Sequence, residues 1–377
     1  MAIIWYIGGE DVRMRIPILK KLSAKGFSVA AVGSEPPEPF AREGITYHRY
    51  DLNRGFSPTS DRRSVQQLVE LFKQHQPDVV HAFDTKPAML VPYAARKAKI
   101  KGVVRTVTGM GWVFSSNSPL ALLLRPVYRK IQMEASRKSD VTIFQNQDDK
   151  QYFESHDLVD PKRSVLVRGS GVDPDDFNFK APDSDELNEL RISLHIERAI
   201  AIVMVSRLVK DKGVLNYLEA ARIVKQSLPQ CHFLLIGPQS SEGSQAVSLN
   251  VIQKYSDCVD WLGSRNDVPA ILSLCDIFVL PSYYREGVPR VLLEAGLKSM
   301  PLITTDMPGC RDVVIDGYDG LLVPPRDSSA LAKAIIKLAS DPELRVIMGA
   351  HAKSQVEKGF LLSSVLQSYV DVYSRLI

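Results

Sequence analysis

Two carboxylates in the second half of the chain stand in a setting that favours an extended anionic ligand. Glu286 and Glu294 belong to the segment EGVPRVLLE. Pro289 suits the first turn of a helix, where its missing N–H would be unpaired anyway, so Gly287 and Val288 form a tight loop before it. Amides at a helix N-terminus attract anions such as diphosphate. The two glutamates could then hold sugar hydroxyls at one end of a ligand and ribose hydroxyls at the other.

Solvated surface charges are the alternative interpretation of this pair, and nearby cations weigh against it. Arg207 and Lys212 lie in SRLVKDKG, directly after the strand-like run AIVMVS. Cations at the carboxyl end of a strand are well placed to bind a diphosphate, although each alone is typical of a surface cation. Arg265 follows another strand-like run in VDWLGSRNDVPAIL, where backbone groups could read the edge of a base. That last signal is weak by itself.

The elements that must position these residues alternate between strand-length apolar runs and amphipathic stretches, which predicts parallel α/β layers. A Gly-, Pro- and Asp-rich segment at 169–187 separates two such series. We therefore expect two doubly wound, Rossmann-like parallel-sheet domains facing each other across a cleft. The expected boundaries are 1–175 for the first domain, 176–358 for the second, and 359–377 for a closing helix that returns to the first. The expected strands are 3–7, 28–32, 79–81, 103–107, 141–144 and 165–167, then 200–205, 233–236, 259–262, 277–280 and 302–304.

Length and charge are consistent with this division. A chain of 377 residues suits two domains. Residues 1–170 carry a net charge of about +9 and the remainder about −5. No window reaches the roughly 18 apolar residues of a membrane span, so any membrane contact is expected to be peripheral.

The C-terminal half resembles glycosyltransferase family 4 in a series of motifs that keep the family's order and spacing. They are SRLVKDKG, LIGP, LGSRNDVP, LPSYYREGVPRVLLEA, PGCRDVV and DGLLVPPRD. The resemblance implies the GT-B architecture and a retaining reaction with no essential metal and no cofactor. It assigns the diphosphate to Arg207 and Lys212, the donor hexose to Glu286 and the ribose to Glu294. Catalytic roles are thus expected for Glu286, Arg207 and Lys212, and donor binding for Glu294, Gly287, Val288, Pro289, Gly8, Gly9, Gly237, Arg265 and Val268.

The N-terminal half resembles family members that build polysaccharide units on a polyprenyl diphosphate carrier. The resemblance lies in YIGGEDVRMRIPILKKL, HAFDTKPAMLVPYAARKAKI and VVRTVTGMGWVF. It implies acceptor binding by Arg15, Asp84, Lys86, Thr108 and Gly109. Many members have a histidine where this chain has Thr108, so an imidazole base is not expected there. We favour the donor phosphate as the group that takes the acceptor proton, with Asp84 as a polar helper.

Two further segments bear on metal and membrane binding. The runs DPD at 173–175 and DSD at 183–185 mimic the acidic motif of metal-dependent transferases but fall in the expected linker, which favours turn and cap roles. The stretch 115–140 combines leucines with Arg125, Arg129, Lys130, Arg137 and Lys138. It predicts either a basic amphipathic helix resting on an anionic membrane or a core helix with a solvated basic face.

The function expected from these residues is transfer of a hexose or N-acetylhexosamine from a UDP-linked donor to a lipid-linked saccharide in polysaccharide biosynthesis. GDP-mannose is an alternative donor. A nucleotide-sugar 2-epimerase of the same architecture and a non-catalytic nucleotide-sugar-binding subunit are the competing hypotheses. We expect a cytoplasmic protein acting at the cytoplasmic face of the membrane, with no nucleic-acid partner.

Overall fold

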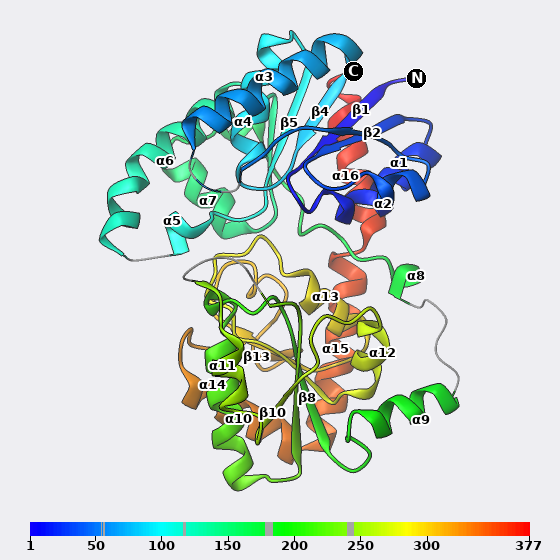
Figure 1. Ribbon diagram of the computed structural model, residues 1–377, viewed down its shortest axis with the longest axis vertical. Helices are drawn as coiled ribbons and strands as arrows, with labels where there is room; N and C mark the ends of the chain where they lie inside the picture. Colours follow the sequence, from blue (N-terminus) through cyan, green and yellow to red (C-terminus); the bar gives the residue numbers. More distant parts are fainter. Residues whose placement is uncertain (54, 56, 116–117, 178–183, 240–244) are drawn as a thin grey trace. The chain divides into compact units, whose positions relative to one another are not determined.

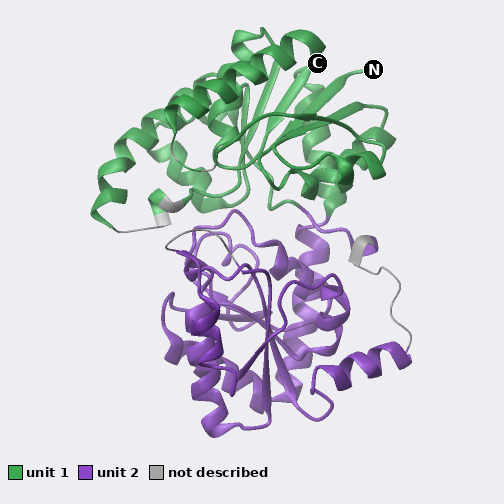
Figure 2. Cartoon of the chain, in the orientation of Figure 1, with its two compact units in different colours: residues 1–170, 362–377 green, residues 171–361 purple. Residues whose placement is uncertain are grey.

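A computed structural model describes residues 1–53, 55, 57–115, 118–177, 184–239 and 245–377. The chain divides into two compact units (Figures 1 and 2). Unit 1 comprises Met1–Ser170 and Leu362–Ile377, and unit 2 comprises Gly171–Leu361. The divisions fall a few residues from the expected boundaries at 175 and 358.

Unit 1 is built on a parallel sheet that has seven strands among the described residues, in the order β3-β2-β1-β4-β5-β6-β7. The strands are β1 (Ile3–Ile7), β2 (Ser28–Gly33), β3 (Thr46–Arg49), β4 (Val79–Ala82), β5 (Gly102–Val107), β6 (Val141–Phe144) and β7 (Ser164–Leu166). The helices of this unit are α1 (Ile16–Ala24), α2 (Glu38–Arg42), α3 (Pro58–His75), α4 (Pro87–Lys97), α5 (Trp112–Ser115), α6 (Pro119–Arg137), α7 (Gln147–Ser155) and α16 (Leu362–Ser374), with 3-10 turns η1 (Val12–Arg15) and η2 (Pro161–Arg163).

Alternation along β1 divides the core of unit 1 between the two faces of its sheet. Ile4 and Tyr6 pack with α1, α2 and α16, whereas Trp5 and Ile7 pack with α3 and α4. Successive side chains of a strand point to opposite faces, so one apolar run supplies both layers. The continuous apolar sequence of β1 is therefore a consequence of burial on both sides.

The last helix, α16, belongs to unit 1 although it follows unit 2 in the sequence (Figure 2). A buried polar chain fastens it to the sheet. The Tyr373 hydroxyl lies 2.8 Å from the Tyr6 hydroxyl and 2.6 Å from His81 Nδ1, and His81 Nε2 lies 2.7 Å from Thr106 Oγ1. Burial lowers the pKa of His81 well below its usual value, so the ring is neutral within this chain.

Unit 2 has a parallel sheet of six strands in its described part, in the order β10-β9-β8-β11-β12-β13. The strands are β8 (Ile200–Val205), β9 (Cys231–Ile236), β10 (Val259–Trp261), β11 (Ile277–Leu280), β12 (Leu302–Thr305) and β13 (Gly320–Val323). The helices are α8 (Pro174–Phe177), α9 (Ser184–Ser193), α10 (Val214–Ser227), α11 (Leu249–Gln253), α12 (Val268–Leu274), α13 (Arg290–Leu297), α14 (Ser328–Ser340) and α15 (Pro342–Gly359), with the 3-10 turn η3 (Lys210–Lys212). The predicted class of two Rossmann-like α/β domains is confirmed.

Candidate active site

The loops that follow β8 and β11 carry the principal candidate residues, and the sheet brings them together. β8 and β11 are parallel neighbours at the centre of the sheet in unit 2. Their carboxyl ends therefore lie at the same edge. Lys212 ends the loop after β8, and Glu286 lies in the loop after β11. The two loops contact each other because their strands are adjacent.

Lys212 and Glu286 form an ion pair between Nζ and Oε1, with side chains that are 19% and 12% exposed. The Ser282 hydroxyl donates to the same carboxylate oxygen at 2.9 Å. The amides of Tyr283 and Tyr284 donate to the Asp211 carbonyl oxygen at 2.9 and 3.1 Å, which fastens the Glu286 loop to the turn that holds Lys212. A cation and a carboxylate are thus held together in a partly desolvated position, where charge interactions are stronger than in bulk water.

Glycines allow these loops to approach each other closely. Gly213 has a φ of +76°, and a Cβ there would lie 2.0 Å from the Pro281 carbonyl oxygen. Gly309 has a φ of +83°, and its Cβ would lie 2.4 Å from the Gly287 carbonyl oxygen. Only glycine fits both the backbone conformation and the available space. Neither Gly213 nor Gly309 was among the expected site residues. Gly213 nevertheless ends the motif SRLVKDKG, and Gly309 lies in the motif PGCRDVV.

The helix carrying Glu294 begins one residue later than its sequence suggests. Pro289 is the N-cap of α13, with an extended ψ of 112°, and the first helical residue is Arg290. Glu294 is 15% exposed and accepts a hydrogen bond from Arg290 Nε at 2.8 Å. Burial raises the pKa of Glu294, and the Arg290 charge opposes that shift. The side chain of Val288 is buried in the core of unit 2, which leaves its backbone groups for any ligand contact.

The other donor candidates of unit 2 lie on neighbouring loops, whereas Gly8 and Gly9 follow β1 in unit 1. Arg207 is exposed at the start of the loop that ends in Lys212. Gly237 has a φ of +145° and donates its amide to the Gly263 carbonyl oxygen at 2.8 Å, which joins the loops after β9 and β10. Arg265 pairs with Asp267 through two contacts of 2.8 and 2.5 Å. Val268 is the first residue of α12.

In unit 1, the glycine loop after β1 is held by Asp84. The amide of Gly9 donates to Asp84 Oδ2 at 3.1 Å, and Gly8 accepts from the Tyr50 hydroxyl at 2.9 Å. Asp84 has a φ of +68°, a left-handed conformation that is uncommon outside glycine and clusters at functional sites. The Asp84 carboxylate therefore lies beside the glycine loop and is bound to it through the Gly9 amide.

Lys86, which is expected to contact the acceptor, has its ammonium engaged within unit 1 in the ligand-free structure. Nζ lies 2.5 Å from Asp61 Oδ1 and donates to the carbonyl oxygens of Asn53 and Gly55 at 2.5 and 2.6 Å. The ammonium thus makes two hydrogen bonds to backbone carbonyl groups and one ion pair. Lys86 thereby holds one wall of a cavity of about 280 Å³ beside the glycine loop, whose lining includes Glu10, Ser34, Arg49, Asp51, Asn53 and Ser60.

The other acceptor candidates lie at the same carboxyl edge of unit 1. Arg15 donates to the Ser170 hydroxyl at 2.9 Å, and its guanidinium carbon lies 4.5 Å from the centre of the Phe83 ring. Thr108 is half-buried in the loop after β5, followed by Gly109 with a φ of +141°. Polar groups therefore lie along the carboxyl edge of this sheet, near the ends of β1, β4 and β5.

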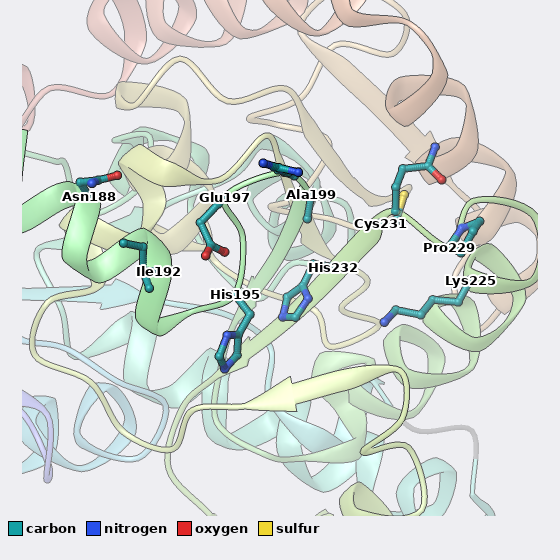
Figure 3. Close-up of a pocket in the computed structure, with 11 residues that line it drawn as sticks. Asn188, Ile192, His195, Glu197, Ala199, Lys225, Pro229, Cys231 and His232 are labelled. Carbon is teal, nitrogen blue, oxygen red and sulfur yellow. The ribbon is translucent and has the colours of Figure 1, made fainter.

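A second cavity of about 610 Å³ lies at the opposite, amino edge of the sheet in unit 2 (Figure 3). Its lining includes His195 and Glu197 from the segment before β8, Lys225 from the last turn of α10 and His232 from β9. Within the described ranges no group of three or more His, Cys, Asp or Glu is arranged to hold a metal. Asp173 of the DPD run accepts from the Asp175 amide at 3.2 Å, as a turn residue does, and Asp183 lies outside the described residues.

Comparison with known proteins bears directly on this arrangement. The family model described as Glycosyltransferase Family 4 matches residues 18–176, and the one described as Glycosyl transferases group 1 matches residues 186–355. The chain belongs to glycosyltransferase family 4. It is a glycosyltransferase, and the motifs that carry Arg207, Lys212, Glu286 and Glu294 fall within the second match.

Curated relatives of this glycosyltransferase align over most of their length. One is the UDP-Gal:alpha-D-GlcNAc-diphosphoundecaprenol alpha-1,3-galactosyltransferase of Escherichia coli, 28% identical over 324 residues, covering 85% of this chain and 81% of the relative. Another is the N,N'-diacetylbacillosaminyl-diphospho-undecaprenol alpha-1,3-N-acetylgalactosaminyltransferase of Campylobacter jejuni, 25% identical over 377 residues, covering 99% and 97%. The crystal structure of Anabaena HepE in complex with UDP has the same GT-B fold, with a TM-score of 0.81 at 17% identity over the full length of both chains.

Proposed function

We propose that this glycosyltransferase moves a hexose or N-acetylhexosamine from a UDP-linked donor to a saccharide carried on a lipid diphosphate, with retention of anomeric configuration. The observation that carries the proposal is the Lys212–Glu286 pair, held by Ser282 at the carboxyl edge of unit 2. Such an edge is where open α/β sheets bind their ligands. The names of the two relatives give acceptors linked to diphosphoundecaprenol, which supports the acceptor class.

The donor is bound through opposite charges in this proposal. Lys212 and Arg207 neutralise the diphosphate, Glu286 accepts hydrogen bonds from the hexose hydroxyls, and Glu294 accepts from the ribose. The ion pair of the ligand-free protein means that a donor takes over contacts which the two side chains now make with each other. Once the donor is bound, a single charged group that faces the developing charge typically contributes about 3 kcal/mol to lowering a barrier.

The reaction itself exchanges two bonds at the anomeric carbon. The bond from that carbon to the phosphate oxygen breaks, and a bond to the acceptor oxygen forms on the same face. The acceptor proton passes to an oxygen of the departing diphosphate, so UDP leaves protonated and the charge is balanced. Thr108 offers no imidazole base, which is consistent with the phosphate as proton acceptor. The cations Arg207 and Lys212 do the neutralising work for which other transferases use a metal, and no cofactor is needed.

The exposed end of α6 supports access to a lipid-borne acceptor. Five apolar side chains, hereafter the α6 apolar patch, are 37–74% exposed: Leu120, Leu122, Leu123, Leu124 and Val127. Arg125 and Arg129 turn instead toward the protein, donating to the Val113 carbonyl oxygen and the Tyr152 hydroxyl at 3.1 and 2.7 Å. Contiguous exposed apolar surface is typical of membrane or protein contact. We infer that the patch enters the membrane interface, with apolar contact rather than the basic side chains as its main contribution.

No helix in the described part of the chain is long and apolar enough to cross a bilayer. Contact through the α6 apolar patch would therefore be peripheral as far as these residues are concerned.

A radiolabelled transfer assay tests the proposed function. UDP-galactose, UDP-glucose, their N-acetylhexosamine counterparts and GDP-mannose are each incubated with N-acetylglucosamine-diphospho-undecaprenol and with its diacetylbacillosamine counterpart. We expect label from one UDP-sugar to appear in the lipid fraction, with an α linkage by NMR. Conversion of a UDP-sugar without acceptor would instead identify the epimerase, and nucleotide binding with no product from any pair would favour the binding subunit.

A further inference from the structure

Arg326 occupies a backbone conformation that its side chain disfavours. It lies in the loop between β13 and α14 with a φ of +65°. A residue with a Cβ is uncommon in this left-handed region, which glycine enters without penalty. A glycine at this exposed position would remove the strain. A strained residue that persists at a candidate site is a reason to look for a functional contact.

The contact that Arg326 makes is with the loop that carries Glu286. Its guanidinium carbon lies 4.3 Å from the centre of the Tyr283 ring, within the range of a cation–π interaction. Tyr283 belongs to the segment whose amides donate to Asp211, and Ser282 in that segment donates to Glu286. The side chain of Arg326 therefore stacks on the junction between the two loops that hold Lys212 and Glu286.

The charges around Asp211 give Arg326 a second role. Asp211 is half-buried next to Lys212 in sequence. Burial raises the pKa of Asp211, and among the charges that oppose this shift Arg326 is the largest, ahead of Lys212 and Lys210, while Glu286 adds to it. Arg326 thus favours the ionised form of Asp211. Without Arg326, the negative charge of Asp211 would be stabilised to a greater extent by Lys212. Lys212 is left to pair with Glu286.

We propose that Arg326 is a positioning residue of the donor site, which braces the Tyr283 loop on the Asp211 turn and so fixes the Lys212–Glu286 pair. The kinetic part of this inference rests on the proposed function. The bracing part does not, because it concerns the order of a loop in the ligand-free protein. The experiment below separates the two.

Hydrogen exchange of the ligand-free protein tests the brace. In Arg326→Gly we expect the amides of Tyr283 and Tyr284 to exchange several-fold faster, because local opening becomes easier, while the melting temperature stays at or above that of the wild type. His195→Gly is the matched control, since His195 also has a left-handed φ, of +55°, but lies at the opposite edge of the same sheet. Unchanged exchange at Tyr283 and Tyr284 in Arg326→Gly would overturn the proposal whether or not the protein is a transferase.

Kinetics then distinguish positioning from direct binding. We expect Arg326→Gly to lower kcat/KM for the donor by about tenfold or more through misplacement of Glu286, with a much smaller loss of UDP affinity through Lys212. Arg326→Lys keeps the charge and should restore part of the activity, though not all, because an ammonium stacks less well than a guanidinium. Loss of UDP affinity by the same factor as kcat/KM would contradict positioning and assign Arg326 to the diphosphate itself. Wild-type kcat/KM in Arg326→Gly would also overturn it.

Discussion

Lys212 and Glu286 neutralise each other in the ligand-free protein, so a donor that uses both must separate them. The pair is only partly exposed, and Ser282 holds the carboxylate from the other side. Removing one member of such a pair leaves the other without its main partner in a poorly solvated place. The same two residues therefore contribute to both stability and the proposed reaction.

Lys212→Ala should reduce transfer by at least about a hundredfold, because the leaving diphosphate loses a preformed cation. The free energy of unfolding should fall by only about 1–2 kcal/mol, since the pair retains some solvent. Initial rates and chemical denaturation measure the two effects. Arg222→Ala, which breaks the exposed Arg222–Glu219 pair on α10, is the control and should alter neither. Wild-type turnover in Lys212→Ala would remove this lysine from the mechanism.

Glu294 makes the donor site sensitive to pH. Its raised pKa means that it takes up a proton at a higher pH than an ordinary glutamate as the solution is acidified. A protonated carboxyl is a poorer acceptor for two ribose hydroxyls, so UDP affinity should fall as pH drops through that pKa. Calorimetric titration of UDP from neutral to mildly acid pH measures this. Glu294→Gln should bind UDP more weakly at neutral pH and lose that component of the pH dependence; an identical profile in the variant would show that another group is responsible.

At the scale of elements, the site depends on how closely two loops pack. The loop after β8 approaches the loop after β11 at Gly213, where the space for a side chain is taken by the Pro281 carbonyl oxygen. Left-handed backbone and steric closeness act together at this position. Any side chain there must push apart the two segments that carry Lys212 and Glu286.

Gly213→Ala should lower the free energy of unfolding by about 1–3 kcal/mol through strain at a left-handed residue and a clash with backbone. Transfer should fall further than stability alone explains, because the ion pair is displaced. Thermal melts and rates at a temperature well below the melting point measure both. Gly26→Ala is a fitting control, since Gly26 is also left-handed, at φ +89°, but has open space around it. Equal activity losses in the two variants would argue against the packing explanation.

The α6 apolar patch makes a prediction of its own. Leu123→Asp should weaken binding to vesicles of phosphatidylcholine and phosphatidylglycerol by about tenfold or more, because it removes an inserted leucine and adds a charge. Val346→Asp, a similarly exposed apolar position on α15 of unit 2, is the control (74% and 73% exposed). Co-sedimentation at low and high salt measures both. If vesicle binding disappears at high salt and Leu123→Asp binds as well as the wild type, the basic side chains rather than the patch would be responsible for binding.

At the scale of the whole molecule, the strands buried on both faces were the most predictable elements. The expected ranges 3–7, 200–205 and 277–280 agree with β1, β8 and β11 to the residue. β3 and β13 were not predicted: β3 is a half-buried edge strand of polar sequence TYHR, and β13 is a four-residue strand that begins with glycine. A partly exposed polar strand such as β3 lacks the apolar run that identifies the central ones, and the glycine that begins β13 weakens its strand pattern.

The candidate site was predicted residue by residue but not as an arrangement. The motifs placed Lys212 and Glu286 around one donor but did not predict their ion pair, which follows from the adjacency of β8 and β11 that local sequence does not specify. Lys86 was expected at the acceptor, and its contact with Asp61, 25 positions earlier on α3, could not be foreseen from the sequence. Contacts between distant segments depend on sheet order, and a single sequence carries little information about them.

The position of a bound nucleotide tests the proposed donor site most directly. In a crystal soaked with UDP, the account predicts the diphosphate within hydrogen-bonding distance of Lys212 Nζ, near Arg207, and the ribose hydroxyls at the Glu294 carboxylate. A diphosphate bound away from the loop that ends in Lys212 would contradict the proposed donor site and the mechanism built on it.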